Sequence, residues 1–130
     1  MTPLQDNSLP KTERLSGTKA IERLMSDGRR GGTAHLRWCW VRRGDEGPNR
    51  IMVSVPKRLF KRAVLRNLLK RRLREAYRTQ KGLLAVQGID FLVSYSTPEL
   101  LDSATIRLEM AELLGSISLK AERTGEEPQP

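Results

Sequence analysis

The chain has very little of what catalytic sites in proteins are built from. It contains one cysteine, Cys39, and one histidine, His35, among 130 residues. An internal disulfide is therefore excluded, and so is a zinc site made of cysteine and histidine ligands. No nucleophile with a histidine base and no pair of carboxylates stands in a pattern that catalysis needs. We therefore expect no catalytic residue and no metal site in the protein itself, and a reducing compartment.

Long apolar runs are also missing. No run approaches the roughly eighteen residues of a membrane-spanning helix, and the first thirteen residues lack the charged-then-apolar order of a signal peptide. These absences predict a cytoplasmic protein. A basic amphipathic helix can lie on an anionic membrane, but the apolar stripe of the basic segment described next is aliphatic and lacks Trp and Phe. We expect no membrane partner.

Acidic residues are nearly absent from one segment, 57–78. It holds ten basic residues and one acidic residue, Glu75, so its net charge of +9 equals that of the whole chain. The rest of the chain has 14 basic and 14 acidic residues. Because the excess positive charge is concentrated on one segment, the expected partner is a nucleic acid.

From Ala63 onward, this basic segment has the period of a helix. An apolar stripe able to face a core recurs every four residues at Leu65, Leu69, Leu73 and Tyr77. A ladder of cations lies about 100° round the helix from it, at Arg62, Arg66, Lys70, Arg74 and Arg78. Like charges at this spacing repel one another, and a solvated face normally interleaves acidic residues with them. A bound polyanion removes the repulsion, so the ladder favours a nucleic-acid-binding face.

The remaining segments predict one α+β domain over residues 14–119. A flexible segment, 1–13, precedes it, and a disordered acidic tail, 120–130, follows it. A first helix is expected over 19–27, with Ser16 or Thr18 as its cap, and then a glycine-rich turn.

Alternating apolar residues predict three strands, over 35–43, 51–55 and 89–95. In the first strand, Leu36, Trp38 and Trp40 share one face, and Arg37, Cys39 and Val41 share the other. Turn-forming residues at 44–49 predict an antiparallel hairpin between the first two strands.

The order of the elements predicts the fold class. The basic helix, expected to end near Gln80, separates the second strand from the third, which implies a crossover and a parallel pair. A last helix is expected over 98–119. The predicted fold is a two-layer α/β sandwich of the α+β class, in which helices pack on a small mixed sheet with a βαβ crossover.

The basic segment resembles the bacterial ribonuclease P protein component. The signature of that family stands here as Lys57-Arg58, Arg66-Asn67, Lys70-Arg71 and Arg74-Glu75, followed by Tyr77-Arg78. Matching features occur at Arg14-Leu15, at Asp27-Gly28-Arg29 and at Gly88-Ile89-Asp90. The resemblance covers residues 14–117.

The resemblance implies an accessory protein subunit of a ribonucleoprotein endoribonuclease, which takes part in tRNA processing. In that family the RNA subunit removes the 5′ leader of precursor tRNA with bound Mg²⁺, and the protein binds both RNAs. It also implies a left-handed crossover. The RNA-binding residues that it implies are Lys57, Arg58, Lys61, Arg62, Arg66, Asn67, Lys70, Arg71 and Arg74. Asn67 is informative, because a patch that only neutralises phosphates does not require an amide.

The resemblance also implies a second site, a cleft on the sheet that holds the single-stranded leader. The matching positions in this chain are Ile21, Met25 and one tryptophan, with Trp40 favoured over Trp38. Stacking of a base on an aromatic ring contributes ~1–3 kcal/mol. The alternative is that both tryptophans and Ile21 are plain core residues.

Other functions fit the same residues in part. A ribosomal protein or an RNA chaperone would bind structured RNA through the same basic helix without supporting cleavage. A DNA-binding protein is disfavoured, because the stripe opposite the arginines is needed for the core and no dimerisation element is visible. A free-standing nuclease is the least favoured class, for want of a site.

Overall fold

The computed structural model describes residues 9–126 and contains a four-stranded mixed sheet with three α-helices. In chain order the elements are α1 (Thr18–Asp27), β1 (Arg29–Gly32), β2 (Leu36–Arg42), β3 (Arg50–Ser54), α2 (Ala63–Arg78), β4 (Ile89–Tyr95) and α3 (Ser103–Glu126). Short 3₁₀ turns lie at Lys11–Glu13 and Lys81–Leu83. The predicted α+β class is confirmed.

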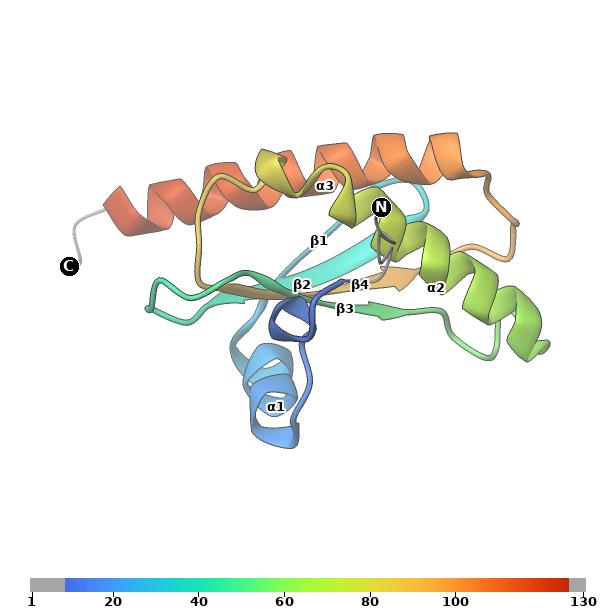
Figure 1. Ribbon diagram of the computed structural model, residues 1–130, viewed down its shortest axis with the longest axis horizontal. Coiled ribbons are helices and arrows are strands. Elements are labelled where there is room, and N and C mark those ends of the chain that lie inside the picture. Colours follow the sequence, from blue (N-terminus) through green and yellow to red (C-terminus); the bar gives the residue numbers. More distant parts are fainter. Residues whose placement is uncertain (1–8, 127–130) are drawn as a thin grey trace, which may run out of the picture.

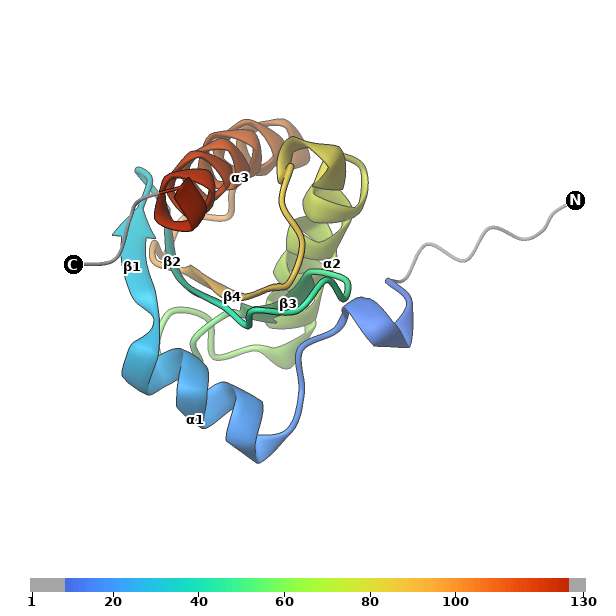
Figure 2. The ribbon, with the colours of Figure 1, turned by 90° about the vertical axis from the view of Figure 1, so that its left-hand side faces the viewer.

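The sheet has the order β1-β2-β4-β3. β2 is antiparallel to both β1 and β4, whereas β3 runs parallel to β4. Helices α2 and α3 cover one face of the sheet, and α1 lies against the other (Figures 1 and 2). The chain passes from β3 through α2 to β4, and in Figure 2, where these strands run away from the viewer, β4 lies to the left of β3 beneath the helices. The crossover is therefore left-handed, as the resemblance implied.

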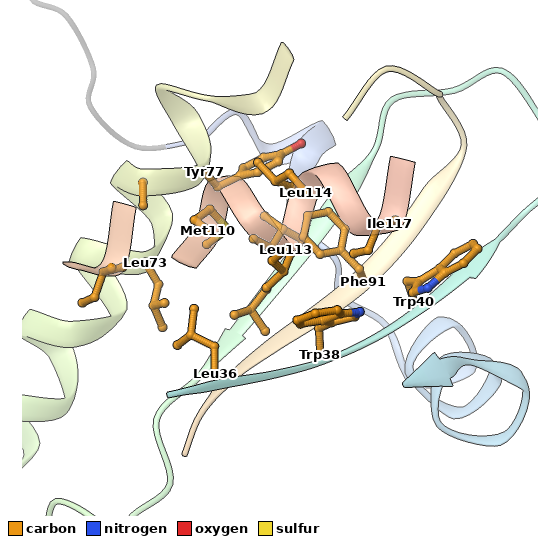
Figure 3. Packing of buried hydrophobic residues seen from close by; sticks show 14 of the residues in the cluster. Leu36, Trp38, Trp40, Leu73, Tyr77, Phe91, Met110, Leu113, Leu114 and Ile117 are labelled. Atoms are coloured by element: carbon orange, nitrogen blue, oxygen red, sulfur yellow. The ribbon is translucent and has the colours of Figure 1, made fainter. Parts of the chain in front are cut away.

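The main core lies between the sheet and the pair α2 and α3. Figure 3 shows Trp38 and Trp40 of β2 packed with side chains of α2 and α3. The rings of Tyr77 and Phe91 meet edge to face, with centroids 5.5 Å apart. The predicted stripe of α2 faces this core, because Leu69, Leu73 and Tyr77 are all buried.

A smaller core lies on the opposite face of the sheet, beneath α1. Leu24 of α1 and Cys39 of β2 are buried there together with Leu15. The Sγ atom of Cys39 donates a hydrogen bond of 3.3 Å to the backbone carbonyl of Leu24. Cys39 is therefore a packed side chain, and the two predicted faces of β2 do point to different cores.

The predicted antiparallel hairpin between the strands at 35–43 and 51–55, which are β2 and β3, is wrong. β4 is inserted between β2 and β3, and the antiparallel hairpin is formed by β1 and β2 instead. The local turn residues at 44–49 do reverse the chain, but Arg43 and Arg50 both bond to Asp90 of β4 across that reversal. The turn residues alone therefore do not specify which strands pair.

The segment predicted as a glycine-rich turn is strand β1. Its composition, Arg-Arg-Gly-Gly, has no residue that favours strands, so nothing local signals it. The predicted caps of α1 are also wrong, because Gly17, with φ of 99°, occupies the N-cap and makes no side-chain capping bond.

The structure contradicts part of each expected tail. Within 1–13, Leu9 is buried in the main core and residues 11–13 form a 3₁₀ turn, while 1–8 lie outside the described residues. Helix α3 continues to Glu126 with Ala121 buried, so 120–126 are helical, and 127–130 lie outside the described residues.

Helix α3 also begins later than predicted, at Ser103. The hydroxyl of Tyr95 donates to the carbonyl of Glu99 at 2.5 Å and accepts from the amide of Leu101 at 2.9 Å, which holds that segment as a loop. The carboxylate of Asp102 then caps the helix by accepting the amide of Thr105 at 2.8 Å. None of the helices within residues 9–126 is long and apolar enough to cross a membrane.

Candidate nucleic-acid interface

The basic segment forms an exposed ridge along the outer side of α2 and the turn before it. We call this surface the basic ridge. Seven of the nine predicted RNA-binding side chains are exposed on it, and Arg66 and Lys70 are half-buried. The ridge consists of Lys57, Arg58, Lys61, Arg62, Arg66, Asn67, Lys70, Arg71 and Arg74. The structure thus brings the predicted residues together on one side of the molecule.

Arg66 differs from the other members of the basic ridge. Its Nη1 atom donates hydrogen bonds of 2.8 Å to the backbone carbonyls of Phe60 and Lys61. These bonds tie the first turn of α2 to the loop that carries Lys57 and Lys61. Arg66 therefore positions other cations of the ridge, a role that the sequence pattern did not reveal.

Arg72, which was not among the predicted residues, anchors α2 to the loop before α3. Its Nη1 atom donates a 2.5 Å hydrogen bond to the carbonyl of Leu101. A hollow of about 790 Å³ opens beside it, between α2 and the start of α3. Asn67, Arg71 and Arg74 of the ridge line this hollow. Part of the ridge is therefore concave, with amide and guanidinium groups at its rim.

Arg74 connects the ridge with a second hollow. This hollow has a volume of about 390 Å³ and lies against β3 and the residues before α1, including Lys11 and Arg14. The amide of Leu15 donates to the carbonyl of Ile51 at 2.9 Å, so the segment before α1 lies along the outer edge of β3. Basic side chains from two parts of the chain, the segment before α1 and helix α2, therefore meet beside β3.

The three residues predicted for the leader cleft do not share one face of the sheet. Ile21 and Met25 belong to α1, on one face. Trp40 is buried in the main core on the opposite face, and so is Trp38. The prediction that Trp40 lines the leader cleft is wrong. Neighbouring residues of a strand point to opposite faces, so the residues of β2 on the α1 side are those next to Trp40. Both tryptophans are core residues, as the alternative stated.

The residues of β2 that do face the α1 side are Arg37, Cys39 and Val41. Cys39 and Val41 lie under α1, but Arg37 is exposed. Arg37 is opposite Ser94 of β4, which is opposite Ser54 of β3, so the three form one row across the sheet. We call this row the open sheet face.

Helix α1 is oriented so that Ile21 and Met25 flank the open sheet face. Its Leu24 points into the sheet, and Arg23 donates to the carbonyl of Arg42 at the far end of β2. At 100° per residue, Ile21 lies on the flank opposite Arg23, toward the Arg37 end of β2. Met25 is 43% exposed on that side. Ile21 and Met25 are therefore placed to contact a single strand of RNA that lies on the sheet.

A buried ion network holds the end of the sheet away from the open sheet face. The Asp90 carboxylate, 3% exposed, accepts hydrogen bonds from Arg43 at 2.6 Å and from Arg50 at 2.7 Å. Bonds from Arg43 and from the amide of Gly47 hold the pKa of Asp45 at about 2. Arg43 and Arg50 are therefore paired with carboxylates of the fold and do not belong to the basic ridge.

The only histidine belongs to a second network, which joins the β1–β2 turn to α3. Oε1 of Glu109 accepts the Thr33 hydroxyl at 2.5 Å and the His35 amide at 2.9 Å. The bond with Glu109 raises the pKa of His35. Burial pushes the pKa of Glu109 upward, but the bonds from Thr33 and His35 outweigh it and the net shift is downward. No group of three or more His, Cys, Asp or Glu side chains within residues 9–122 is arranged to hold a metal ion.

The chain is similar to known proteins over most of its length. A model of the family described as Ribonuclease P matches residues 9–118. The ribonuclease P protein component of Chlorobaculum tepidum is 41% identical over 83 residues, which are 60% of this chain and 54% of that protein. The protein of the same name from Dictyoglomus thermophilum is 36% identical over 86 residues, covering 66% of this chain and 69% of that protein. The chain thus spans about half the length of the first relative.

Solved structures have the same fold. The RNase P protein of Staphylococcus aureus superimposes with a TM-score of 0.71 at 22% identity, over 82% of this chain and 96% of that one. The RNase P protein of Thermotoga maritima gives a TM-score of 0.70 at 24% identity, over 80% and 96% of the two chains.

Proposed function

Because this chain belongs to the ribonuclease P protein family, we propose that it is the protein subunit of a ribonuclease P ribonucleoprotein, which removes the 5′ leader of precursor tRNA. The observation that carries the proposal is the basic ridge. A helix whose other side is fixed in the main core presents an amide among guanidinium and ammonium groups, all on one side of the molecule.

In this proposal the basic ridge binds the catalytic RNA. Arg71 and Arg74 are exposed and line the hollow beside α2, so their planar guanidinium groups can bond to two phosphate oxygens at once. Asn67, on the same side, offers both donors and an acceptor to a phosphate or a 2′-hydroxyl. Because α2 is already folded against the core, no backbone entropy of helix formation is lost when the RNA binds.

The 5′ leader would lie on the open sheet face. Arg37 supplies a cation and the two serines supply hydroxyl groups, while Ile21 and Met25 supply apolar surface on one side. The basic ridge begins at Lys57, three residues after the end of β3, so RNA bound to the ridge can continue onto the sheet. This placement replaces the tryptophan of the predicted cleft with Arg37.

The chain itself would carry out no bond cleavage. We assign the Mg²⁺ that the reaction needs to the RNA subunit, and we assign binding and positioning of the two RNAs to the protein. In this arrangement the protein neutralises phosphates that would otherwise repel one another, so the ribonucleoprotein should need less Mg²⁺ than the RNA alone.

The test is cleavage of a precursor tRNA at low Mg²⁺ by the cognate RNA, with and without this protein. Cleavage that requires both components is the expected result. The variant Arg71→Ala/Arg74→Ala should raise the protein concentration needed by at least tenfold, whereas Arg107→Ala, an exposed cation of α3, should leave it unchanged. Tight binding of this RNA without any gain in cleavage would overturn the proposal in favour of a general structured-RNA-binding protein.

A further inference from the structure

Strand β1 is the outer strand of the sheet, at the edge farthest from β3. It pairs with β2 alone, and Figure 2 shows it on the side of the sheet away from α2. Its four residues, Arg29–Gly32, contain no apolar side chain that would bury it. We call this element the β1 edge.

The β1 edge pairs with β2 and packs on the tryptophans of that strand. The guanidinium carbon of Arg29 lies 5.6 Å from the ring centroid of Trp40, on the face of the sheet that α3 covers. Gly31 lies against the Trp38 indole so closely that an added Cβ would come within 2.5 Å of the ring. The position after the two arginines is therefore restricted to glycine by packing.

The cations of this region have no acidic partner within residues 9–122. Arg30 donates one hydrogen bond, of 3.3 Å, to the carbonyl of Met25, and neither Arg29 nor Arg37 forms an ion pair there. Residues 18–42 hold six basic and two acidic residues, a net charge of +4. The chain outside this region and outside 57–78 has eight basic and twelve acidic residues. Residues 18–42 are therefore a second positive region. It does not appear in the net charge of the chain outside 57–78, which is zero.

The open sheet face connects the two positive regions. Ser54, Ser94 and Arg37 lie in register across β3, β4 and β2, and Gly32 of β1 is the next partner of Arg37. The row spans three inter-strand spacings, about 14 Å. It begins near Lys57 of the basic ridge and ends at the β1 edge, where Gly32 is exposed.

We propose that the β1 edge binds phosphates of the part of the 5′ leader that extends beyond the open sheet face. This inference rests on the proposed function, since it requires a leader on the sheet. Arg29 and Arg30 point to opposite faces of the sheet, so they can hold an RNA strand that passes over the edge of the sheet. Their guanidinium groups suit phosphate oxygens, and the lack of acidic neighbours leaves these charges uncompensated until RNA binds.

The experiment measures binding of the assembled ribonucleoprotein to precursor tRNAs that differ only in leader length. For a long leader, Arg29→Ala/Arg30→Ala should weaken binding several-fold and make the slope of log K against log salt shallower by about 1.4, the value for two single-strand phosphate contacts. For a leader shortened to a few nucleotides, the same variant should match the wild type. Arg29→Lys/Arg30→Lys should keep most of the affinity, and Arg107→Ala should change nothing.

Three outcomes would overturn the inference. They are unchanged binding of the long leader, an equal loss for short and long leaders, and weaker binding to the catalytic RNA in the absence of precursor. The melting temperature of each variant checks that the contact between Arg29 and Trp40 is not needed for folding, and the Lys variant separates charge from packing. If the wild-type protein supports no cleavage, the proposed function fails. If it does and the variants show no dependence on leader length, only the present inference fails.

Discussion

The ring nitrogen Nδ1 of His35 lies 2.5 Å from Oε2 of Glu109, which joins the turn between β1 and β2 to the middle of α3. On its other side, Nε2 of the same ring lies 3.5 Å from a carboxylate oxygen of Glu99. The single histidine is thus held between two carboxylates, and its charge affects how firmly the sheet edge is attached to α3.

The stability of the protein should depend on pH through this histidine. The pKa of His35 is raised in the folded state, so its contribution is fully present below its ordinary value of 6.5 and is lost as the pH rises through the folded pKa. The pKa of Glu109 is lowered, so its contribution is lost only as the pH falls below its ordinary value of 4.5. Denaturant unfolding at pH 6 to pH 9 should show a fall in the free energy of unfolding for the wild type.

The variant His35→Gln should remove most of that fall and be less stable than the wild type at pH 6. Glu112→Gln, at an exposed position of the same helix, serves as the control and should keep the wild-type profile. An unchanged pH profile in His35→Gln would show that the pair does not couple to folding.

Arg66 and Arg71 should behave differently although both belong to the basic ridge. Arg66→Ala loses two hydrogen bonds to backbone carbonyls, so it should lower the free energy of unfolding by about 1–2 kcal/mol. Arg71→Ala should change it by less than about 0.5 kcal/mol, since the side chain is exposed. Urea unfolding measures both values, and equal stabilities would contradict the anchoring role given to Arg66.

Asp90 should be among the most sensitive charged positions. Asp90→Asn leaves Arg43 and Arg50 without their shared carboxylate in a largely buried site, so we expect a loss of about 3–5 kcal/mol. The matched control is Asp45→Asn, whose side chain is 60% exposed and should cost less than about 1 kcal/mol. Thermal unfolding followed by circular dichroism would compare the two, and similar melting temperatures would refute the prediction.

Two glycines should respond to alanine with opposite signs. Gly31→Ala drives a methyl group into the Trp38 indole, and the overpacking should cost about 1–3 kcal/mol. Gly115→Ala, in α3 with open space around it, should stabilise the protein by roughly 0.5–1 kcal/mol because alanine favours the helix. The difference in melting temperature between the two variants tests whether β1 is packed as described.

Sequence reasoning located α2 and its ridge because local signals agreed there. The leucine stripe and the cation ladder share one helical period, so both sides of the helix could be assigned before any tertiary contact was known. The alternation in β2 likewise separated Trp40 from Cys39. The sequence does not indicate which face of the sheet α1 covers. The prediction of Trp40 for the leader site is wrong for this reason, since Trp40 and α1 lie on opposite faces.

The strand β1 and the order of the sheet lay beyond local reasoning for a different reason. Arg29–Gly32 is extended through its pairing with β2 and packs on the indoles of that strand, and no propensity scale contains those contacts. Strand β4 lies between β2 and β3, where its Asp90 bonds to Arg43 and Arg50, forty or more residues earlier in the chain. Both features are decided by distant pairs, which a pattern within a short window does not record.

The central position of β4 has a consequence for synthesis of the chain. A nascent polypeptide that ends before Ile89 holds the β1–β2 hairpin, β3 and α2, but it lacks the strand that joins them. The arginines of α2 are then already translated, while the sheet that should hold the helix is still in two pieces. Next to ribosomal RNA, such an intermediate is a cationic helix whose apolar stripe is still uncovered, and we expect synthesis of β4 and α3 to cover that stripe.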